Sequence, residues 1–324
     1  MSKAAQIPRP VDAAGCWACG PDAAVRAISY VCEQAEIPAA DARVVGMPGE
    51  ITVVVLEKAG LVARVADLVR LGRLRRELLV ATYLSGAGIP VASPAVACSC
   101  RQLAVVGDRV ITWWTYEPGE RADWPQLARV LRRLHEVPTP VPRYLALPRL
   151  DPFARLRSQL CAATGLASPD LDAFARHIGA LSERWAASHL AQEPELEEPE
   201  TVLHGAAWPA NTLAVGGRVH LLDLDHVAVG PIGYDLRALY AFGRLGWLDE
   251  KEIAEFRDGY GEPVSDADAD LLADLHLVEM TGAYAALTAE YPHVLDQARL
   301  RIASLSDARL LPDWWMAWRP EPAC

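Results

Sequence analysis

Residues 204–223 are the most informative stretch of this 324-residue sequence. They read His204-Gly205-Ala206-Ala207-Trp208-Pro209-Ala210-Asn211-Thr212-Leu213-Ala214-Val215-Gly216-Gly217-Arg218-Val219-His220-Leu221-Leu222-Asp223. The apolar runs on either side of Gly216-Gly217 predict two short antiparallel strands, because paired glycines supply the positive φ angles of a type I′ turn. This tight turn returns the chain alongside itself, so Asn211 and Asp223 are expected at the same open end of the hairpin.

Asn211 and Asp223 carry the oxygen atoms that a hard metal ion prefers. Cross-strand neighbours lie about 5 Å apart, so an amide oxygen and a carboxylate at this end of the hairpin suit an Mg²⁺ ion that carries phosphates. Asn211 is also the single asparagine of the chain. The alternative is structural: Asn211 closes a turn and Asp223 caps the end of a strand.

Apart from the hairpin after Asn211, the predicted secondary structure changes once along the chain, near residue 115. Before that point, β-branched runs predict one hairpin from 51–56 and 61–65 and another from 103–106 and 110–114. One helix is expected between them, because Leu71, Leu74, Leu78 and Ala81 recur at helical spacing. The later part is mostly helical, as the stripe Leu127, Val130, Leu131 and Leu134 illustrates. A β-rich part followed by a helical part indicates an α+β fold.

Three further motifs follow the hairpin: Leu222-Asp223-Leu224-Asp225-His226, Gly230-Pro231 and Tyr234-Asp235-Leu236. Together with residues 204–211 they resemble the aminoglycoside phosphotransferase family of small-molecule kinases. The signature of that family is H-G-D-x-x-x-x-N, a short hairpin, D-x-D/E and then G-x-x-x-x-D-L, whose Asp is structural. The resemblance implies a protein-kinase-like fold with two lobes. Residues 1–115 are the expected small antiparallel β lobe with one helix, and residues 116–324 the larger, mostly helical lobe.

The resemblance also implies that the β lobe binds ATP or GTP. Arg64 occupies the place of the cation that neutralises the phosphates, and Glu77 that of the helix acid which pairs with it. Trp114, Thr115 and Tyr116 are expected in the hinge that holds the base. The loop Met47-Pro48-Gly49-Glu50 lies where a phosphate-covering loop belongs.

By the same resemblance, His204, Asn211 and Asp223 belong to the catalytic machinery, and Asn211 and Asp223 hold the Mg²⁺. Asp225 is expected behind the metal ligands, with a further contribution to the substrate site. The third residue of the family motif is the Asp that accepts the proton of the attacking hydroxyl, and here it is Ala206. A methyl group accepts no proton, so a rate loss of about 10²–10⁴ is expected.

Two explanations of Ala206 compete. The chain is either a naturally non-catalytic member of the family or an active enzyme that was inactivated by an Asp→Ala change. The second is favoured, because Arg64, Glu77, Asn211 and Asp223 are all retained. The leading hypothesis is thus an antibiotic resistance or self-resistance kinase in a base-less form. The alternatives are a nucleotide- or ligand-binding pseudokinase and a metabolic kinase of the same superfamily.

The expected acceptor is a hydroxyl on a small, cationic molecule, because the net charge is −11. Trp208 is a candidate to frame the acceptor site. Glu279 shares a helix face with Leu272 and Leu275, so it is either a partly buried acid that points at the cleft or a solvent-facing Glu. The aromatic stretch 314–318 could line a pocket or fix the tail to the body of the protein.

The composition excludes several classes of function. A pI near 5.2 argues against nucleic acid or an anionic membrane as partner. The first residues lack the apolar segment of a secretory signal, and no apolar run is long enough to span a bilayer. A cytoplasmic protein with reduced thiols is therefore expected. The pairs Cys16/Cys19 and Cys98/Cys100 could meet around zinc, but incidental thiols are the simpler interpretation.

Overall fold

A computed structural model describes residues 21–45, 51–95, 102–140, 144–191, 201–261, 265–289 and 291–310. The chain divides into two compact units. Unit 1 comprises Met1–Ala122, Pro140–Ala146 and Ala210–Val227, and unit 2 comprises Asp123–Thr139, Leu147–Pro209 and Ala228–Cys324. Each unit has its own secondary structure and its own core.

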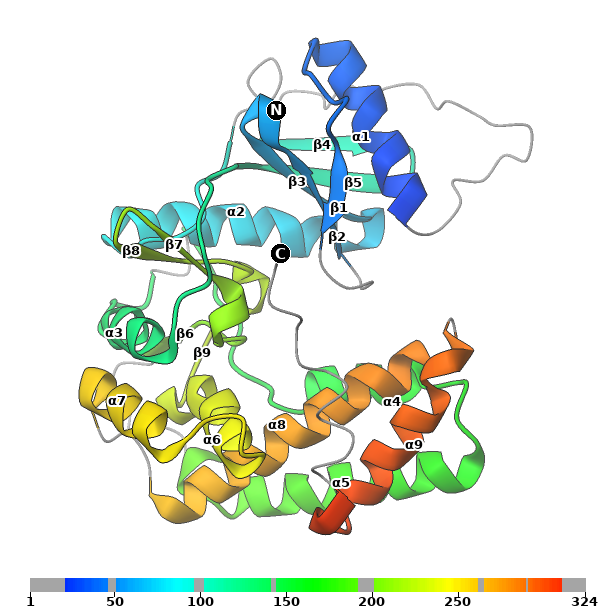
Figure 1. Ribbon diagram of the computed structural model, residues 1–324, viewed down its shortest axis with the longest axis vertical. Helices are drawn as coiled ribbons and strands as arrows, with labels where there is room; N and C mark the ends of the chain where they lie inside the picture. Colours follow the sequence, from blue (N-terminus) through cyan, green and yellow to red (C-terminus); the bar gives the residue numbers. More distant parts are fainter. Residues whose placement is uncertain are drawn as a thin grey trace. The chain divides into compact units, whose positions relative to one another are not determined.

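Unit 1 is built on a five-stranded antiparallel sheet with the strand order β1-β2-β3-β5-β4 (Figure 1). Its strands are β1 (Arg43–Val45), β2 (Ile51–Leu56), β3 (Leu61–Asp67), β4 (Leu103–Val106) and β5 (Arg109–Thr115). The two predicted hairpins are confirmed as β2–β3 and β4–β5. Gly60 closes the first of them with a φ of 67°, a conformation that glycine adopts without steric cost.

Two helices pack on opposite faces of this sheet, whereas the sequence predicted one. The predicted helix is α2 (Leu71–Gly86), and the additional one is α1 (Pro21–Ala35). Side chains of α1 share a core with Ala63 and Val65 of β3. Leu74 of α2 packs on Ala66, which points to the other face of the same strand. The prediction of one helix is wrong, although the buried stripe of α1, with Ala24, Ala27, Ile28 and Val31, has the helical spacing from which α3 was predicted.

The hairpin after residue 211 belongs to unit 1. Its strands are β7 (Thr212–Val215) and β8 (Arg218–Leu221), and Gly216 and Gly217 have φ values of 55° and 78°. The predicted hairpin with its left-handed glycine turn is thus confirmed. Leu221 exchanges backbone hydrogen bonds with Pro90 and Ala92, which follow α2. For this reason the division differs from the predicted boundary at residue 115, which assigned the hairpin to the helical part.

Unit 2 is mostly helical, as predicted. Its helices are α3 (Trp124–His135), α4 (Ala154–Ala162), α5 (Ser168–Ala186), α6 (Arg237–Arg244), α7 (Glu250–Tyr260), α8 (Asp266–Leu287) and α9 (Leu295–Ser304). A two-stranded sheet joins β6 (Thr201–Leu203) to β9 (Ala228–Gly230). The predicted stripe of α3 is buried at all four positions. Within the described residues, no helix has the length and apolar character needed to cross a membrane.

Candidate active site

Arg64 is the centre of an ion-pair cluster in unit 1. Its Nη1 lies 2.8 Å from Oε1 of Glu77 on α2, and its Nη2 lies 2.6 Å from Oδ1 of Asp223, which follows β8. The side chain of Glu77 is 1% exposed and that of Arg64 12%. The predicted pairing of Arg64 with Glu77 is therefore present, and one guanidinium group ties β3, α2 and the end of the β7–β8 hairpin together.

The alternation of β3 places Arg64 at this cluster. Ala63 and Val65 point into the core beneath α1, so Arg64 points to the opposite face. Ala66 shares that face and packs on Leu74 of α2. Leu74 lies three residues before Glu77, which is close to one helical turn, so the packing that holds α2 on the sheet also brings Glu77 to Arg64.

A second arginine, Arg73, lies one helical turn before Glu77 on α2. Its Nε lies 2.8 Å from Oδ2 of Asp225, and its Nη2 lies 2.8 Å from Nε2 of His226. The Asp225 side chain is 1% exposed and also lies 3.6 Å from Arg64. Asp225 therefore lies in the same cluster as Asp223, and the supporting role that the sequence analysis gave it stays a prediction.

The cluster holds three carboxylates against two guanidinium groups. Burial raises the pKa of Glu77 to about 8, an effect that Arg64 opposes and that the charges of Asp225 and Asp223 reinforce. Two buried carboxylate oxygens, Oε2 of Glu77 and Oδ1 of Asp225, accept no hydrogen bond from the described residues. Positive charge bound next to the cluster would therefore lower the pKa of Glu77 again.

The segment 223–226 suits a divalent cation. Asp223, Asp225 and His226 offer ligand atoms that all lie within 4.8 Å of one another, and hard carboxylate oxygens are the ligands that Mg²⁺ prefers. The N–H of Leu222 donates to the backbone oxygen of Asn211 at 2.9 Å. Asn211 thus lies across the hairpin from the residue before Asp223, which confirms that both reach the same open end.

The backbone at Asp223 is left-handed, with a φ of 58°. Among the described non-glycine residues only Glu36 shares a positive φ. Such a conformation is uncommon for a non-glycine residue, and Asp is among the residues that tolerate it best. The turn lets Asp223 and Asp225 both approach Arg64, and backbone outliers of this kind concentrate at functional sites.

The predicted hinge residues lie at the end of β5. Trp114 is buried and donates its Nε1–H to Thr112 at 3.1 Å. The backbone N–H groups of Thr115 and Tyr116 donate to the carbonyl oxygens of Ser93 and Gly60, at 2.9 Å each. A base held by Thr115 or Tyr116 would therefore be contacted through their carbonyl groups or side chains.

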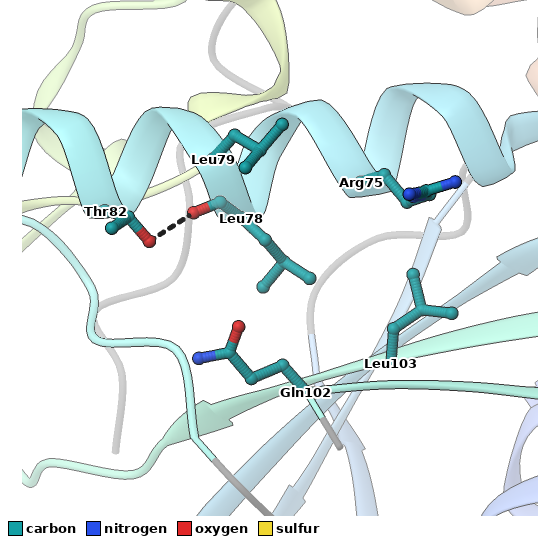
Figure 2. Close-up of a pocket in the computed structure, with 6 residues that line it drawn as sticks. All are labelled: Arg75, Leu78, Leu79, Thr82, Gln102 and Leu103. Carbon is teal, nitrogen blue, oxygen red and sulfur yellow. Dashed lines mark hydrogen bonds between the residues drawn. The ribbon is translucent and has the colours of Figure 1, made fainter. Parts of the chain in front are cut away.

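A pocket of about 340 Å³ lies between α2 and β4 in unit 1 (Figure 2). It is lined by Arg75, Leu78, Leu79, Thr82, Gln102 and Leu103, and the Thr82 hydroxyl donates to the Leu78 carbonyl within its wall. Arg75 and Leu79 each lie two residues from Arg73 or Glu77, which is about 200° around the helix axis. The pocket is therefore on the side of α2 away from the Arg64 cluster.

In unit 2, the loop that follows β6 is held by Asp235. The N–H groups of His204 and Gly205 donate to its two carboxylate oxygens at 2.6 and 2.7 Å, and Nε2 of His135 lies 3.0 Å from it. Although burial alone raises the pKa of Asp235, the hydrogen bond from His135 and the charges nearby hold it below its usual value. Asp235 thus occupies the structural place that the sequence motif implied.

His204 and Trp208 are both tied into unit 2. The buried ring of His204 accepts a hydrogen bond on Nδ1 from the N–H of Ala206 at 3.2 Å. The half-buried ring of Trp208 meets Phe242 edge to face, with 6.1 Å between ring centroids, and Trp247 packs on the same Phe242. Ala206 lies between these two residues in the sequence. Its side chain is a methyl group, which can neither accept a proton nor orient a hydroxyl.

Glu279 is buried inside unit 2, so the expectation of a solvent-facing residue is wrong. Its side chain is 4% exposed, its Oε2 lies 2.8 Å from Nε of Arg237, and its Oε1 accepts from the Tyr234 hydroxyl at 2.9 Å. The pairing with Arg237 outweighs burial and keeps the pKa of Glu279 far below its usual value. Both oxygens are committed to internal partners, which places Glu279 in the scaffold of the loop.

Two arginines of these networks, Arg73 and Arg237, were not singled out from the sequence. The spacing of Arg73, four residues before Glu77, was the available signal for the first, and the position directly after Asp235-Leu236 for the second. Other predictions fall outside the described residues: the loop Met47 to Glu50, the pairs Cys16/Cys19 and Cys98/Cys100, and the aromatic stretch 314–318.

The model of the phosphotransferase enzyme family matches residues 52–275, well over half of the chain, so the protein belongs to that family. No curated protein matches the sequence. The match includes the Arg64 cluster, the loop around Ala206 and Asp235. Membership confirms the resemblance that the motifs indicated.

Several solved structures share the fold. An amicoumacin kinase in complex with AMP-PNP, Ca²⁺ and Ami is 16% identical, with a TM-score of 0.64 over 90% of this chain and 96% of its own. A spectinomycin phosphotransferase in complex with ADP and spectinomycin is 16% identical, with a TM-score of 0.59 over 91% and 94%. A choline/ethanolamine kinase family protein from Mesorhizobium loti is 17% identical, with a TM-score of 0.56 over 91% and 99%. These similarities confirm the predicted α+β, protein-kinase-like fold.

Proposed function

We propose that this phosphotransferase takes the γ-phosphoryl group of ATP or GTP to a hydroxyl of a small, cationic molecule such as an antibiotic, and that Ala206 leaves it strongly impaired. The observation that carries the proposal is the Arg64 cluster, in which one guanidinium joins Glu77 to Asp223 at 2.8 and 2.6 Å. A cytoplasmic location, where nucleoside triphosphates are available, goes with this proposal.

In this proposal Arg64 neutralises the α and β phosphates while Glu77 holds it in place. Asp223, with Asn211 from the other strand at the same open end of the hairpin, would hold Mg²⁺. Asp225, which Arg73 holds in place, would support Asp223 through Arg64. When bound, the ion neutralises the negative charge of the phosphates and orients them. Trp114, Thr115 and Tyr116 are the proposed contacts of the base.

The missing base limits turnover rather than binding. Phosphoryl transfer depends mainly on positioning and electrostatics, so a loss of about 10²–10⁴ in rate, not complete inactivity, is expected at Ala206. The retained cluster and the retained loop geometry support inactivation of an otherwise complete enzyme by an Asp→Ala change. A non-catalytic nucleotide-binding protein is the alternative that Ala206 itself favours.

The class of acceptor is inferred from the net charge, from Trp208 and from the proteins that share the fold. The net charge of −11 favours a cation, and the half-buried Trp208 offers an aromatic surface two residues from Ala206. Amicoumacin and spectinomycin kinases share the fold, which supports an antibiotic. The choline/ethanolamine kinase family protein shares it as well, so a metabolic kinase is the second candidate.

The test compares the protein with its Ala206→Asp variant. Each is incubated with Mg-ATP or Mg-GTP and a panel of hydroxylated antibiotics, choline and sugars, and mass spectrometry detects the gain of one phosphoryl group. We expect product from the Asp variant at a rate at least about 100-fold higher. An Ala206→Asn variant is the matched control, because it has nearly the same shape as Asp but no basicity.

Each outcome decides between the candidates. Product from antibiotics alone supports a resistance kinase, whereas product from choline or sugars alone supports a metabolic kinase. If both proteins bind nucleotide and neither makes product, the non-catalytic alternative replaces the proposal. Full activity of the protein with Ala206 would show that residue 206 is not the base position.

A further inference from the structure

The loop of residues 204–206 is held from a second side by Arg237, the first residue of α6. The Nη2 of Arg237 donates to the carbonyl oxygen of Gly205 at 2.8 Å, and its Nη1 donates to the Tyr234 carbonyl at 2.8 Å. Its Nε donates to Oε2 of Glu279 at 2.8 Å. Arg237 therefore joins the loop to α8 through a single planar group with fixed donor directions.

This network reaches four backbone groups around Gly205. Asp235 accepts from the N–H groups of His204 and Gly205, Arg237 donates to the Gly205 carbonyl, and the N–H of Ala206 donates to His204. The peptide between Gly205 and Ala206 is thus hydrogen-bonded at both its oxygen and its nitrogen. Because Gly205 has a φ of 79°, these bonds select one of several conformations that a glycine can adopt.

The ion pair behind this contact is enclosed by protein. Arg237 and Glu279 are both buried. The guanidinium carbon of Arg237 lies 3.9 Å from the centroid of the Tyr234 ring, and the Tyr234 hydroxyl donates to the second carboxylate oxygen of Glu279. A buried ion pair generally stabilises a fold no better than apolar side chains of the same size. What it provides that apolar side chains cannot is a directed donor at the Gly205 carbonyl.

We propose that Arg237 and Glu279 are positioning residues, which fix the peptide between Gly205 and Ala206 and thereby the direction of the side chain at position 206. Glu279 orients the guanidinium group, and the guanidinium group orients the peptide. The catalytic consequence rests on the proposed function, but the positioning itself does not. Through Glu279, α8 thus helps to fix the conformation of the loop that carries residue 206, although Glu279 is not itself a catalytic residue.

The test needs a variant that folds without leaving a lone buried charge. In Arg237→Met combined with Glu279→Gln, both charges are removed and the Gln oxygen still accepts from Tyr234. The matched control is Arg244→Met combined with Asp274→Asn, which breaks another ion pair between α6 and α8 that does not touch the loop. Thermal unfolding and the amide exchange of Val202 in β6 confirm that both variants keep the fold.

The first readout is hydrogen–deuterium exchange of single amides in the protein as it stands, with Ala206. We expect the amides of Gly205 and Ala206 to exchange about tenfold faster or more in the Arg237/Glu279 variant, because the loop opens locally. In the Arg244/Asp274 control they are expected to stay within about twofold of the unchanged protein. Unchanged exchange at both amides in the folded Arg237/Glu279 variant overturns the proposal.

The second readout is steady-state kinetics in the Ala206→Asp background. A displaced carboxylate is expected to lower kcat about 10–100-fold while the KM for the nucleotide stays within about twofold. Arg237→Lys, which keeps the charge but not the planar fork, should recover part of kcat. Equal kcat values with and without the pair also overturn the proposal. If the Ala206→Asp protein is itself inactive, the proposed function fails, and the exchange measurement alone decides about the positioning residues.

Discussion

Arg64 and Asp223 are 159 residues apart in the sequence and 2.6 Å apart in the structure. The contact joins β3, the central strand of the sheet, to the end of the β7–β8 hairpin, which comes much later in the sequence but belongs to the same unit. Glu77 holds the same guanidinium from α2. The cluster is therefore a structural junction as well as the proposed phosphate and metal site, and the two roles predict different effects of substitution.

Replacing Arg64 by Met is expected to destabilise unit 1 by about 3–5 kcal/mol, because Glu77 and Asp225 remain buried without this counter-charge. Chemical denaturation monitored by tryptophan fluorescence measures the loss. Asp67→Asn is the control on the same strand: it removes an exposed ion pair with Arg109 and should cost less than about 1 kcal/mol. Equal costs for the two variants would contradict the structural role of the Arg64 cluster.

Substitutions of Asp223 and Asp225 are expected to have different effects, the first on metal binding and the second on the stability of the fold. The Asp223 side chain is 35% exposed and that of Asp225 1%. Asp223→Asn should weaken the affinity for Mg-ATP about tenfold or more with little change in the melting temperature. Asp225→Asn should instead lower the unfolding free energy by about 2–4 kcal/mol, because Arg73 and Arg64 lose a buried partner.

Isothermal titration with Mg-ATP and thermal unfolding, performed on both variants, distinguish these effects. The titration is repeated with ATP and excess EDTA, because a contribution from the metal must disappear there. If Asp223→Asn binds Mg-ATP like the unchanged protein, Asp223 is not a metal ligand.

The ion pair between Glu279 and Arg237 predicts how the unfolding free energy changes with pH in the acid range. The pKa of Glu279 is lowered in the folded state from an unperturbed value of 4.5. The carboxylate therefore contributes its full stability above pH 4.5 and loses it as the pH falls through the lower folded pKa. We expect the unfolding free energy of the protein to exceed that of Glu279→Gln by about 3–5 kcal/mol at pH 7.

The two curves should converge as the pH is lowered, since protonation makes Glu279 neutral like Gln. Urea denaturation at intervals between pH 7 and pH 2 measures the difference. A gap between the curves that stays constant down to the lowest pH would show that ionisation of Glu279 is not linked to folding.

Replacing Gly119 by a residue with a side chain is predicted to destabilise the fold for steric reasons. A Cβ there would lie 2.6 Å from the carbonyl oxygen of Ala214 and 2.9 Å from Cγ2 of Val215. The backbone around Ala214 cannot give way, because Ala214 and Glu120 exchange backbone hydrogen bonds. Gly119→Ala should therefore lower the unfolding free energy by about 1–3 kcal/mol. Gly179→Ala, inside α5 with open space around it, should raise it by about 0.5–1 kcal/mol.

The elements with strong local signals were predictable from the sequence. Gly216-Gly217 predicted the β7–β8 hairpin because consecutive glycines at a tight turn leave few alternatives. The pairing of Arg64 with Glu77 followed from a family resemblance that covers both residues. Helix α1 was predictable as well, because its buried Ala24, Ala27, Ile28 and Val31 recur at helical spacing, but this stripe was not used in the prediction.

The orientation of Glu279 could not be predicted for a different reason. Its neighbours on α8 are buried on several faces, as Leu272, Ala273 and Leu277 show, so no polar stripe defines an outside. Arg73 and Arg237 carried only the signal of their positions, four residues before Glu77 and directly after Asp235-Leu236. That signal does not stand out, because the chain has 28 arginines and most arginines lie in solvent. Their partners became apparent only once segments distant in the sequence were brought together.

The loop around Ala206 owes its conformation to Asp235, Arg237 and His204, and to no side-chain atom of residue 206 itself. An exchange between Ala and Asp at this position is therefore expected to leave the fold of the loop unchanged. In the genetic code, alanine and aspartate codons differ only at the second base when the third is a pyrimidine. With such a codon, loss and recovery of the carboxylate are each a single point mutation, and the gene remains one mutation away from encoding the complete motif.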